Sequence, residues 1–394
     1  MSELPLSPSS TSALLEELHL LTRTNRIDWQ QPMDEALIHA GFDYALTPRQ
    51  WATLPWYGVL EVLRQDTRTS DILVNGPGRP ITIVQAGARF SSGVEAHESW
   101  IRFAQDQLLL RSGVLDARQL TERAQLLPWP KPLLLGTADR RLRFAVTERR
   151  ATPDGPTIAL RVLPTRWSTL ADLVRTNLLP LGAANMLLEA LRCGVTVLVA
   201  GGTGSGKTTL TAALMEAIGA EKRIVVIEEA RELPSLPDGV AVEVGNSPLG
   251  FAECVRFALR QKPDLIVVGE IRGSEALAML QAAATGHSGI GTVHAPDVQA
   301  ALKNTERMAC EHPDVQPNIV RGLLTSSAVP LIVCHIGRYD GVRCVGAIDE
   351  VLPQAGGSQA GDRYVTHPLY AWSRETKTVV RRGTVQGEWG RGRW

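Results

Sequence analysis

Residues 201–208 read Gly-Gly-Thr-Gly-Ser-Gly-Lys-Thr, which matches the pattern G-x-x-x-x-G-K-[ST] of a phosphate-binding loop. The apolar run before it, 195–200, has the β-branched composition of a buried parallel strand. The run after it, 209–218, is typical of a helix, and Gly219 stands where such a helix often ends. A strand, a glycine-rich loop and a helix in this order predict a nucleotide site at one edge of a parallel sheet.

Each part of this loop has a chemical task. Glycines let the backbone wrap around a phosphate group, and N–H groups at the start of the helix point at its oxygens. Lys207 offers a positive charge to the β- and γ-phosphates, and Thr208 offers a hydroxyl to Mg²⁺. The predicted nucleotide-binding residues are Gly201, Gly202, Thr203, Gly204, Ser205, Gly206, Lys207, Thr208 and Thr209.

Composition and length set limits on the rest of the chain. The 394 residues suit two domains, and the formal net charge of zero argues for neither a nucleic-acid nor a membrane partner. The first residues lack the features of a signal peptide, and no apolar stretch reaches the roughly 18–20 residues of a membrane-spanning helix. The five scattered cysteines are typical of reduced, mostly buried thiols, so we expect a cytoplasmic protein.

Changes in composition and residue pattern divide the chain into successive parts. The first 50 residues are expected to form a helical leader, with an amphipathic helix near 12–23 and a second helical stretch near 33–40. The last residues, from Arg374, carry six basic and two acidic side chains and are expected to be a solvated, flexible end. The predicted parts are a leader (1–50), an α+β domain (51–165), a linker (166–180), an α/β domain (181–352), and a C-terminal hairpin with a basic tail (353–394).

The two domains differ in their expected elements. In the first, two β-branched runs, 71–75 and 81–84, flank a Gly/Pro turn and predict a hairpin, and strands are expected at 141–147 and 157–163. In the second, strands and helices alternate, which predicts a mostly parallel sheet covered on both faces. Its expected strands are 195–200, 223–228, 240–244, 265–268, 290–294 and 330–336, and its expected helices 183–192, 207–218, 250–261, 274–284 and 298–309.

Carboxylates follow two of these strands. Glu228 and Glu229 end the strand 223–228, where they could hold Mg²⁺ through water or order an attacking water, although a surface acidic turn would look the same. Glu270 ends the strand 265–268 and could polarise the water that attacks a γ-phosphate. Gly269 stands where the common form of this motif has an aspartate.

Two histidines lie seven residues apart, at 287 and 294, around a turn of small residues and a strand. Without a cysteine or a third ligand nearby they do not make a zinc site. We favour a sensor of the γ-phosphate, carried on the strand beside Glu270.

Four motifs together resemble one protein family in their order and spacing. They are the phosphate loop, the Ile-Glu-Glu turn, the Val-Gly-Glu-Ile-Arg-Gly strand end and the Thr-Gly-His…Thr-Val-His-Ala segment. The chain is similar to the secretion ATPases of type II and type IV secretion and of type IV pili. Within that group it most resembles the conjugation and Tad-pilus branches. The likeness spans about 51–352, and the tetracysteine zinc element of the type II secretion branch is absent from the sequence.

The resemblance implies a RecA-like P-loop NTPase motor domain of α/β class with a smaller α+β N-terminal domain, and ATP and Mg²⁺ as ligands. It implies a homohexamer, cytoplasmic and peripheral at the inner membrane, with secretion or pilus platform proteins as partners. The family's acidic box reads Glu-Asp, so Glu229 in place of the Asp leaves open whether Glu228 or Glu229 contacts a metal-bound water. The catalytic residues implied are Glu228, Glu229, Glu270, His287 and His294, with phosphate-binding arginines at Arg141, Arg161, Arg256 and Arg260.

The sequence therefore predicts a hexameric ATPase whose hydrolysis drives a domain movement in type IV secretion or conjugative transfer. Assembly of a Tad or type IV pilus is the alternative system. An ATP-gated scaffold with little turnover is an alternative activity. A DNA-translocating ring is disfavoured, because no path of aromatic and basic residues for single-stranded DNA is evident, and direct nucleic-acid binding is not expected.

Overall fold

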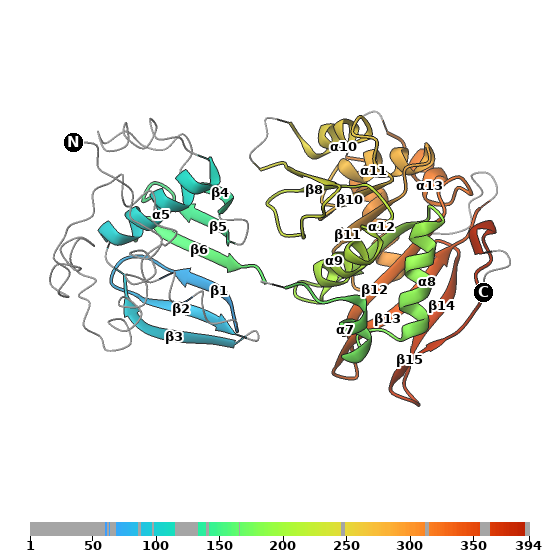
Figure 1. Cartoon of the computed structure of the whole chain (residues 1–394), viewed down its shortest axis with the longest axis horizontal. Coiled ribbons are helices and arrows are strands. Elements are labelled where there is room, and N and C mark those ends of the chain that lie inside the picture. The colour runs from blue at the N-terminus through green and yellow to red at the C-terminus, as the bar shows by residue number, and fades with distance from the viewer. Residues whose placement is uncertain are drawn as a thin grey trace. The chain divides into compact units, whose positions relative to one another are not determined.

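The computed structural model describes Leu60, Leu63 and residues 68–85, 88–96, 98–114, 133–138, 142–164, 166–245, 249–311, 315–354 and 363–390. The chain forms two compact units, residues 1–165 and 166–394 (Figure 1). The expected leader 1–50 and its two helices lie outside the described residues.

Unit 1 is built on a six-stranded antiparallel sheet in the order β3-β2-β1-β6-β5-β4. The predicted hairpin around the Gly/Pro turn is β1 and β2, and the predicted strands 141–147 and 157–163 are β5 and β6. Helix α5 packs against the sheet. The elements are β1 Thr69–Val74, β2 Pro80–Gln85, β3 Ala88–Glu95, α5 Glu98–Ser112, β4 Leu133–Ala138, β5 Leu142–Thr147 and β6 Thr157–Val162.

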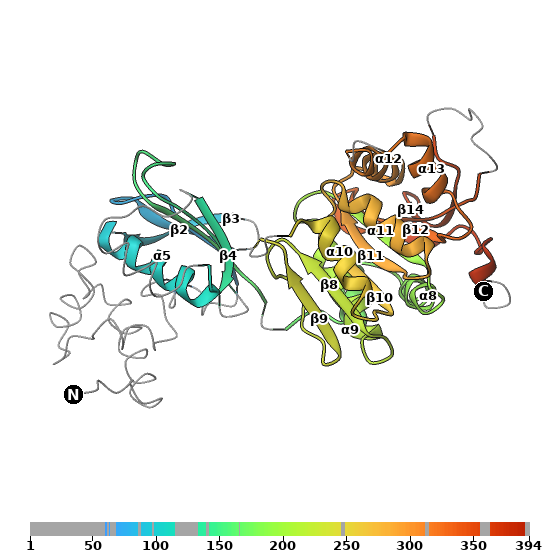
Figure 2. The same cartoon turned by 90° about the horizontal axis from the view of Figure 1, so that it is seen from above.

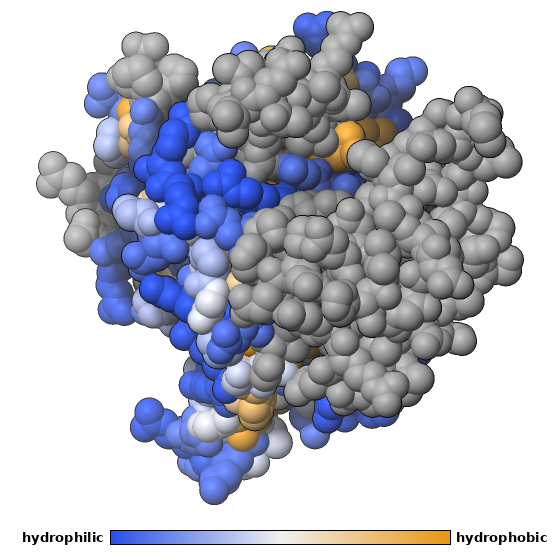
Figure 3. Space-filling view, turned by 90° about the vertical axis from the view of Figure 1, so that its left-hand side faces the viewer, coloured by the Kyte–Doolittle hydropathy of each residue, from blue (hydrophilic) through white to orange (hydrophobic). Residues whose placement is uncertain are grey.

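Alternation of side chains along the strands gives unit 1 its core. In β5, Leu142, Phe144 and Val146 are buried while the residues between them are partly exposed, as the period of two requires. Ile101 and Leu108 of α5 are buried as well. The residues coloured in Figure 3 are mostly hydrophilic, in keeping with an apolar core that lies beneath the surface.

Unit 2 is built on a nine-stranded sheet in the order β15-β14-β13-β12-β7-β11-β10-β8-β9. The strands from β12 to β9 in this order are parallel, which confirms the predicted α/β class. The strands are β7 Thr196–Gly201, β8 Ile224–Glu228, β9 Gly239–Glu243, β10 Leu265–Val268, β11 Gly289–Val293, β12 Leu331–Tyr339, β13 Val342–Val351, β14 Thr366–Ser373 and β15 Thr378–Arg381.

Helices cover both faces of this sheet, and Figure 2 shows α12 and α13 on one side and α8 and α9 on the other. One core lies between the sheet and α7, α8 and α9, and the second between the sheet and α10 to α13. The helices are α7 Leu170–Arg175, α8 Leu181–Arg192, α9 Lys207–Ile218, α10 Phe251–Leu259, α11 Glu275–Ala284, α12 Val298–Ala309 and α13 Pro317–Leu324. Two of these, α7 and α13, are not among the helices expected from the sequence.

The segment expected as a linker, 166–180, is packed into unit 2. It contains α7, which begins with a capping box between Thr169 and Asp172. Leu173, Leu178 and Leu179 are buried in the core shared with α8 and α9. Burial of these three leucines packs the segment against the core of unit 2, so the boundary between the units falls at 165 rather than across fifteen residues.

The C-terminal segment also differs from the solvated end expected from its charge. Strand β15 pairs with β14, and the chain then returns to the buried carboxylate of Glu350. Glu350 accepts hydrogen bonds from the backbone N–H groups of Gln386 and Gly387 and from the indole of Trp389, at 2.8, 3.0 and 2.9 Å. A buried carboxylate with three donors anchors this segment as far as Gly390; Arg391 and Arg393 lie outside the described residues.

None of the five cysteines is in a disulfide, and Cys254, Cys334 and Cys344 are buried, as predicted for reduced thiols. None of the helices that the structure describes is long and apolar enough to cross a membrane.

Candidate functional site

The phosphate loop joins the carboxyl end of β7 to α9, as the sequence predicts. Gly206 is the N-cap residue of α9 with φ of 109°, a conformation that favours glycine. Gly202, Thr203 and Gly204 are exposed at the tip, and Ser205, Thr208 and Thr209 are partly buried. The Oγ atom of Ser205 is buried and has no hydrogen-bond partner. The loop is therefore a built turn at a helix N-terminus with an unused donor inside it.

Lys207 is 8% exposed, and its ammonium folds back onto the loop. Its Nζ donates to the carbonyl oxygens of Gly201 and Gly202 at 3.0 and 2.9 Å. Burial lowers the pKa of Lys207, and the nearby Glu270 carboxylate opposes that shift. A buried ammonium whose hydrogen bonds go to carbonyl oxygens of its own loop is suited to an anionic ligand, because phosphate oxygens pair with its full charge.

The Glu270 carboxylate, just past β10, is held between His294 and Arg272. Its Oε1 lies 2.7 Å from Nε2 of His294, and its Oε2 lies 2.5 Å from the guanidinium of Arg272. Arg272 also reaches Glu229, at 2.7 Å. These side chains form one polar cluster at the carboxyl edge of the parallel sheet, the edge where open α/β sheets bind their ligands.

Arg272 is the main residue of this cluster to which the sequence reasoning gave no role. It is half-exposed and bridges both carboxylates. Burial lowers its pKa, but the two carboxylates raise it by more, so the pKa of Arg272 is raised overall. Its backbone N–H and that of Gly273 donate to the buried carboxylate of Glu275, which fixes the turn after β10. The signal was in the sequence, since Arg272 and Glu275 follow Glu270 by two and five residues.

Glu228 and Glu229 have different surroundings although they are adjacent. Glu228 is 6% exposed, and its carboxylate accepts hydrogen bonds from the backbone N–H groups of Glu232 and Leu233 at 3.1 Å. Burial raises its pKa to about 7, against the lowering effect of those bonds. The side chain of Glu229 is 37% exposed and faces Arg272. Glu228 therefore holds the turn after β8, while Glu229 is accessible to a solvated ion.

The absence of the common aspartate at position 269 has a steric cause. A Cβ atom on Gly269 would lie 2.8 Å from Cγ of Glu228, closer than real contacts allow. Strands β8 and β10 pair in parallel with Ile227 opposite Val268, which puts the next two residues side by side. The side chain of Glu228 thus occupies the space that a residue at 269 would need.

The two histidines lie at opposite ends of β11. His294 follows the carboxyl end, where its carbonyl accepts a hydrogen bond from Asn304. His287 precedes the amino end, where its Nδ1 lies 3.3 Å from the hydroxyl of Thr285. With strand residues rising about 3.3 Å each, the two are roughly 20 Å apart. The structure brings His294 to Glu270 and leaves His287 at the other edge of the sheet.

The arginines named from the sequence are placed as follows. Arg256 and Arg260 are exposed at the end of α10, four residues apart on one helix face. Arg161, in β6 of unit 1, is half-exposed, and its Nε lies 3.1 Å from the carboxylate of Asp71 on the neighbouring strand. Arg141 lies outside the described residues.

Oxygen donors for a metal are present in small number. Among the described residues no group of three or more His, Cys, Asp or Glu side chains could hold a metal ion. Mg²⁺ binds nucleotide sites through one or two protein oxygens, water and phosphates, so the Thr208 hydroxyl and the exposed Glu229 carboxylate fit it.

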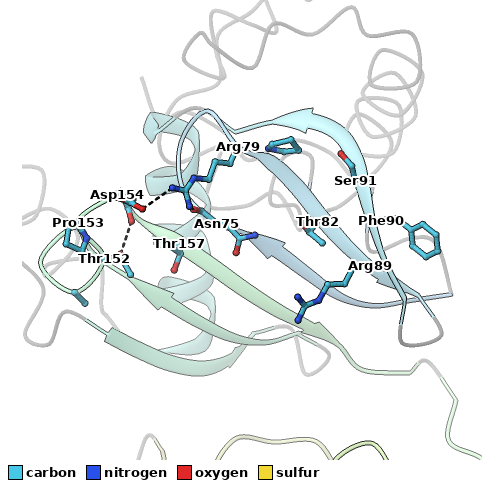
Figure 4. Close-up of a pocket in the computed structure, with 13 residues that line it drawn as sticks. Asn75, Arg79, Thr82, Arg89, Phe90, Ser91, Thr152, Pro153, Asp154 and Thr157 are labelled. Carbon is cyan, nitrogen blue, oxygen red and sulfur yellow. Dashed lines mark hydrogen bonds and ion pairs between the residues drawn. The ribbon is translucent and has the colours of Figure 1, made fainter.

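A separate hollow of about 930 Å³ lies on unit 1 (Figure 4). Arg79 and Arg89 contribute to its lining, but Arg79 is paired with Asp154 at 2.9 Å. Its lining lacks a phosphate-binding loop, and one of its two arginines is already paired with a carboxylate. The cluster around Glu270 and Lys207 is therefore the stronger candidate for a reaction site.

Comparison with known proteins finds relatives of this chain. A profile of the family described as type II/IV secretion system protein matches residues 100–347. A Mycobacterium tuberculosis protein named as a conjugal transfer protein is 36% identical over 248 residues, 60% of this chain and 68% of that protein. The type IV secretion system protein PtlH of Bordetella pertussis is 40% identical over 160 residues, 38% of this chain and 47% of PtlH.

Two solved structures share the fold. The pilus retraction motor PilT with bound ADP has a TM-score of 0.55 at 23% identity, covering 76% of this chain and 84% of PilT. The Legionella pneumophila ATPase DotB has a TM-score of 0.52 at 22% identity, covering 74% and 78%. At these identities the likeness establishes the fold alone.

The buried carboxyl of Glu228 predicts a distinctive pH dependence of stability. Its pKa of about 7 in the folded chain exceeds the ordinary 4.5, so the folded state holds an extra proton between these values. Below pH 4.5 this group adds about 3 kcal/mol to the free energy of unfolding. That contribution falls as the pH rises above 4.5 and is lost once the pH has passed through 7. Glu228→Gln, which is always neutral, should lack this loss.

The measurement is the free energy of unfolding in urea for the wild type and Glu228→Gln from pH 5 to 8. Glu216→Gln is the control, because it removes a carboxylate from an exposed position of α9 rather than from a buried one. Parallel curves for the wild type and Glu228→Gln would contradict the prediction.

Proposed function

The chain belongs to the type II/IV secretion system protein family, and we propose that it is the Mg²⁺-dependent ATPase of a type IV secretion or conjugative transfer system. The observation that carries this proposal is the Glu270 carboxylate, fixed by His294 and Arg272 near the buried Lys207. A phosphate loop alone indicates binding; a positioned carboxylate beside it indicates hydrolysis.

ATP binding would use the loop residues 201–209. The backbone N–H groups at the start of α9 receive phosphate oxygens, and Lys207 exchanges its two carbonyl partners for the β- and γ-phosphates. The exchange is favourable because an ammonium pairs more strongly with an anion than with neutral carbonyls.

Hydrolysis would use the cluster around Glu270. A carboxylate at this position would accept a hydrogen bond from the water that attacks the γ-phosphate and so orient that water. His294 shares that carboxylate at 2.7 Å, so it is placed to exchange Glu270 for the γ-phosphate and to report its presence. Arg272 keeps Glu270 and Glu229 oriented. His287, at the other edge of the sheet, has no part in this step within one subunit.

Mg²⁺ would be held by the Thr208 hydroxyl and, through water, by Glu229. When bound, the ion neutralises charge on the phosphates. Glu229 suits this role better than Glu228, since its side chain is exposed while that of Glu228 is buried and bound to backbone N–H groups.

We further propose a homohexamer, cytoplasmic and peripheral at the inner membrane, that docks on platform proteins of the secretion system. Arg141 and Arg161 would supply phosphate contacts from unit 1, and Arg256 and Arg260 from α10. A guanidinium stays charged and forks onto phosphate oxygens, so arginines brought in by assembly would couple ATP binding to domain closure.

Two alternatives remain open to test. The same motor could assemble a Tad or type IV pilus, since the fold is shared with a pilus retraction motor. It could also be a scaffold that binds ATP with little turnover, which steady-state phosphate release by the purified protein distinguishes directly.

Two substitutions separate binding from hydrolysis. Lys207→Ala should abolish ATP turnover and weaken nucleotide affinity, because the phosphates lose their point charge. Glu270→Gln should bind ATP with near wild-type affinity but reduce kcat about 100-fold or more, because the amide cannot act as a carboxylate. Phosphate release and nucleotide titration measure both; loss of affinity together with turnover in Glu270→Gln would make Glu270 structural.

Arg161 tests the contribution of unit 1. Arg161→Ala should lower turnover several-fold and leave the melting temperature without nucleotide nearly unchanged, because an exposed ion pair contributes at most about 1 kcal/mol. Arg79→Ala is the matched control: it breaks the exposed pair with Asp154 in the same unit and should not change turnover.

Light scattering of the same samples should show a hexamer in the presence of nucleotide. Equal turnover in Arg161→Ala and the wild type, or full activity of a monomer, would contradict the proposed contribution in trans.

A further inference from the structure

Three aromatic side chains of β12 and β14 contact one another near the cluster around Glu270, which we call the reaction cluster. His335, in β12, is 6% exposed and sits opposite Ala200, the residue before the phosphate loop. Its Nδ1 lies 2.6 Å from the hydroxyl of Tyr339, and the two rings meet edge to face. Tyr339 in turn stacks on Trp372 of β14 with ring centroids 5.9 Å apart.

His335 also reaches the segment that carries His294. A hydrogen bond with the backbone of Ala295 raises its pKa, as does the charge of Asp297, but the larger effect of burial lowers the pKa overall. A buried histidine held neutral has one nitrogen that donates and one that accepts. Because Nδ1 faces the Tyr339 hydroxyl, the bond to the Ala295 backbone falls to Nε2, which donates its N–H to the carbonyl oxygen. In a neutral imidazole Nδ1 is then the acceptor, and the Tyr339 hydroxyl donates to it. The proton of His335 is then on Nε2, the nitrogen left for the carbonyl of Ala295.

The sheet makes room for this arrangement. Opposite His335 and Ile336, β13 carries an extra residue, Gly346, in a β-bulge. A Cβ atom on Gly346 would lie 1.9 Å from the ring of Tyr339, so the ring occupies the place of the missing side chain. The Asp340–Gly341 turn has positive φ at both residues, and Asp340 accepts the indole N–H of Trp372 at 3.0 Å. Tyr339 is thus held in one position by its hydrogen bond to His335, its fit against Gly346 and its stacking on Trp372.

We propose that His335 is a positioning residue for hydrolysis: it holds the Ala295 backbone so that His294 meets Glu270, and the Tyr339 hydroxyl sets the tautomer that makes this bond. Ala295 directly follows His294, whose Nε2 lies 2.7 Å from Glu270. The proposal deepens the ATPase function proposed above and rests on it. It makes the antiparallel part of the sheet, β13 and β14, part of the support of the reaction cluster.

Tyr339→Phe tests the tautomer directly, because it removes only the hydroxyl and keeps the ring that fills the bulge. We expect kcat for ATP hydrolysis to fall about 3- to 10-fold, the effect of one lost hydrogen bond, with KM and nucleotide affinity unchanged. Tyr370→Phe is the matched control: Tyr370 is a buried tyrosine of β14 whose hydroxyl faces Gly182 of α8, so kcat should not change.

Two variants at 335 separate positioning from packing. His335→Gln places an amide donor near the position of Nε2 and should keep most of the turnover. His335→Asn places its amide near Nδ1, away from Ala295, and should lose turnover at least as much as Tyr339→Phe. Equal turnover in Gln and Asn variants, or wild-type kcat in Tyr339→Phe, would overturn the proposal.

Crystal structures of the wild type and Tyr339→Phe provide a readout that does not depend on activity. Loss of the contact between His294 Nε2 and Glu270 Oε1 in the variant is the expected result, and an unchanged contact would overturn the inference. If the wild type itself hydrolyses no ATP, the proposed function fails, while this comparison still decides whether His335 positions His294.

Discussion

The pairing of β10 with β11 is the constraint on which the reaction cluster depends. The two strands are parallel neighbours with Val268 opposite Gly291, and this register brings Glu270, two residues past β10, level with Val293, which His294 directly follows. Thr292 strengthens this junction by donating its hydroxyl to the carbonyl of Gly269 at 2.6 Å. Parallel pairing of β7 with β11 brings the phosphate loop to the same edge. A shift of register by one residue in β11 would turn its side chains to the other face and separate His294 from Glu270.

Five carboxylates of unit 2 form two groups that differ in burial and partner. Three are almost fully buried and accept backbone N–H groups that fix a turn: Glu228 after β8, Glu275 after β10 and Glu350 at the C-terminal segment. Two are partly exposed and share Arg272: Glu229 and Glu270. Buried carboxylates with backbone donors are fixed in place, while the exposed pair can exchange its partners for water, a metal ion or phosphate. This difference in surroundings is the reason why we propose reactive roles for the second group only.

The sequence predicted the class of the fold and most elements of unit 2, because strong β-branched runs and a glycine-rich loop leave few alternatives. It also named Lys207, Glu270 and His294, which the structure brings to one edge of the sheet. It could not separate Glu228 from Glu229, because the direction in which each of two adjacent side chains points depends on the neighbouring strand, which the sequence does not place. For the same reason it grouped His287 with His294, although a strand length separates them. The role of Arg272 and the packing of the C-terminal segment depend on contacts between residues far apart in the chain, such as Trp389 with Glu350.

The central claim is that the loop at 201–209 and the Glu270 cluster form one ATP-hydrolysing site. A crystal structure with Mg²⁺ and a non-hydrolysable ATP analogue tests it most directly. The account predicts that Nζ of Lys207 leaves the carbonyls of Gly201 and Gly202 for the β- and γ-phosphates, with Glu270 hydrogen-bonded to a water in line with the γ-phosphate. A nucleotide bound elsewhere, with Lys207 still on its own loop carbonyls, would contradict it.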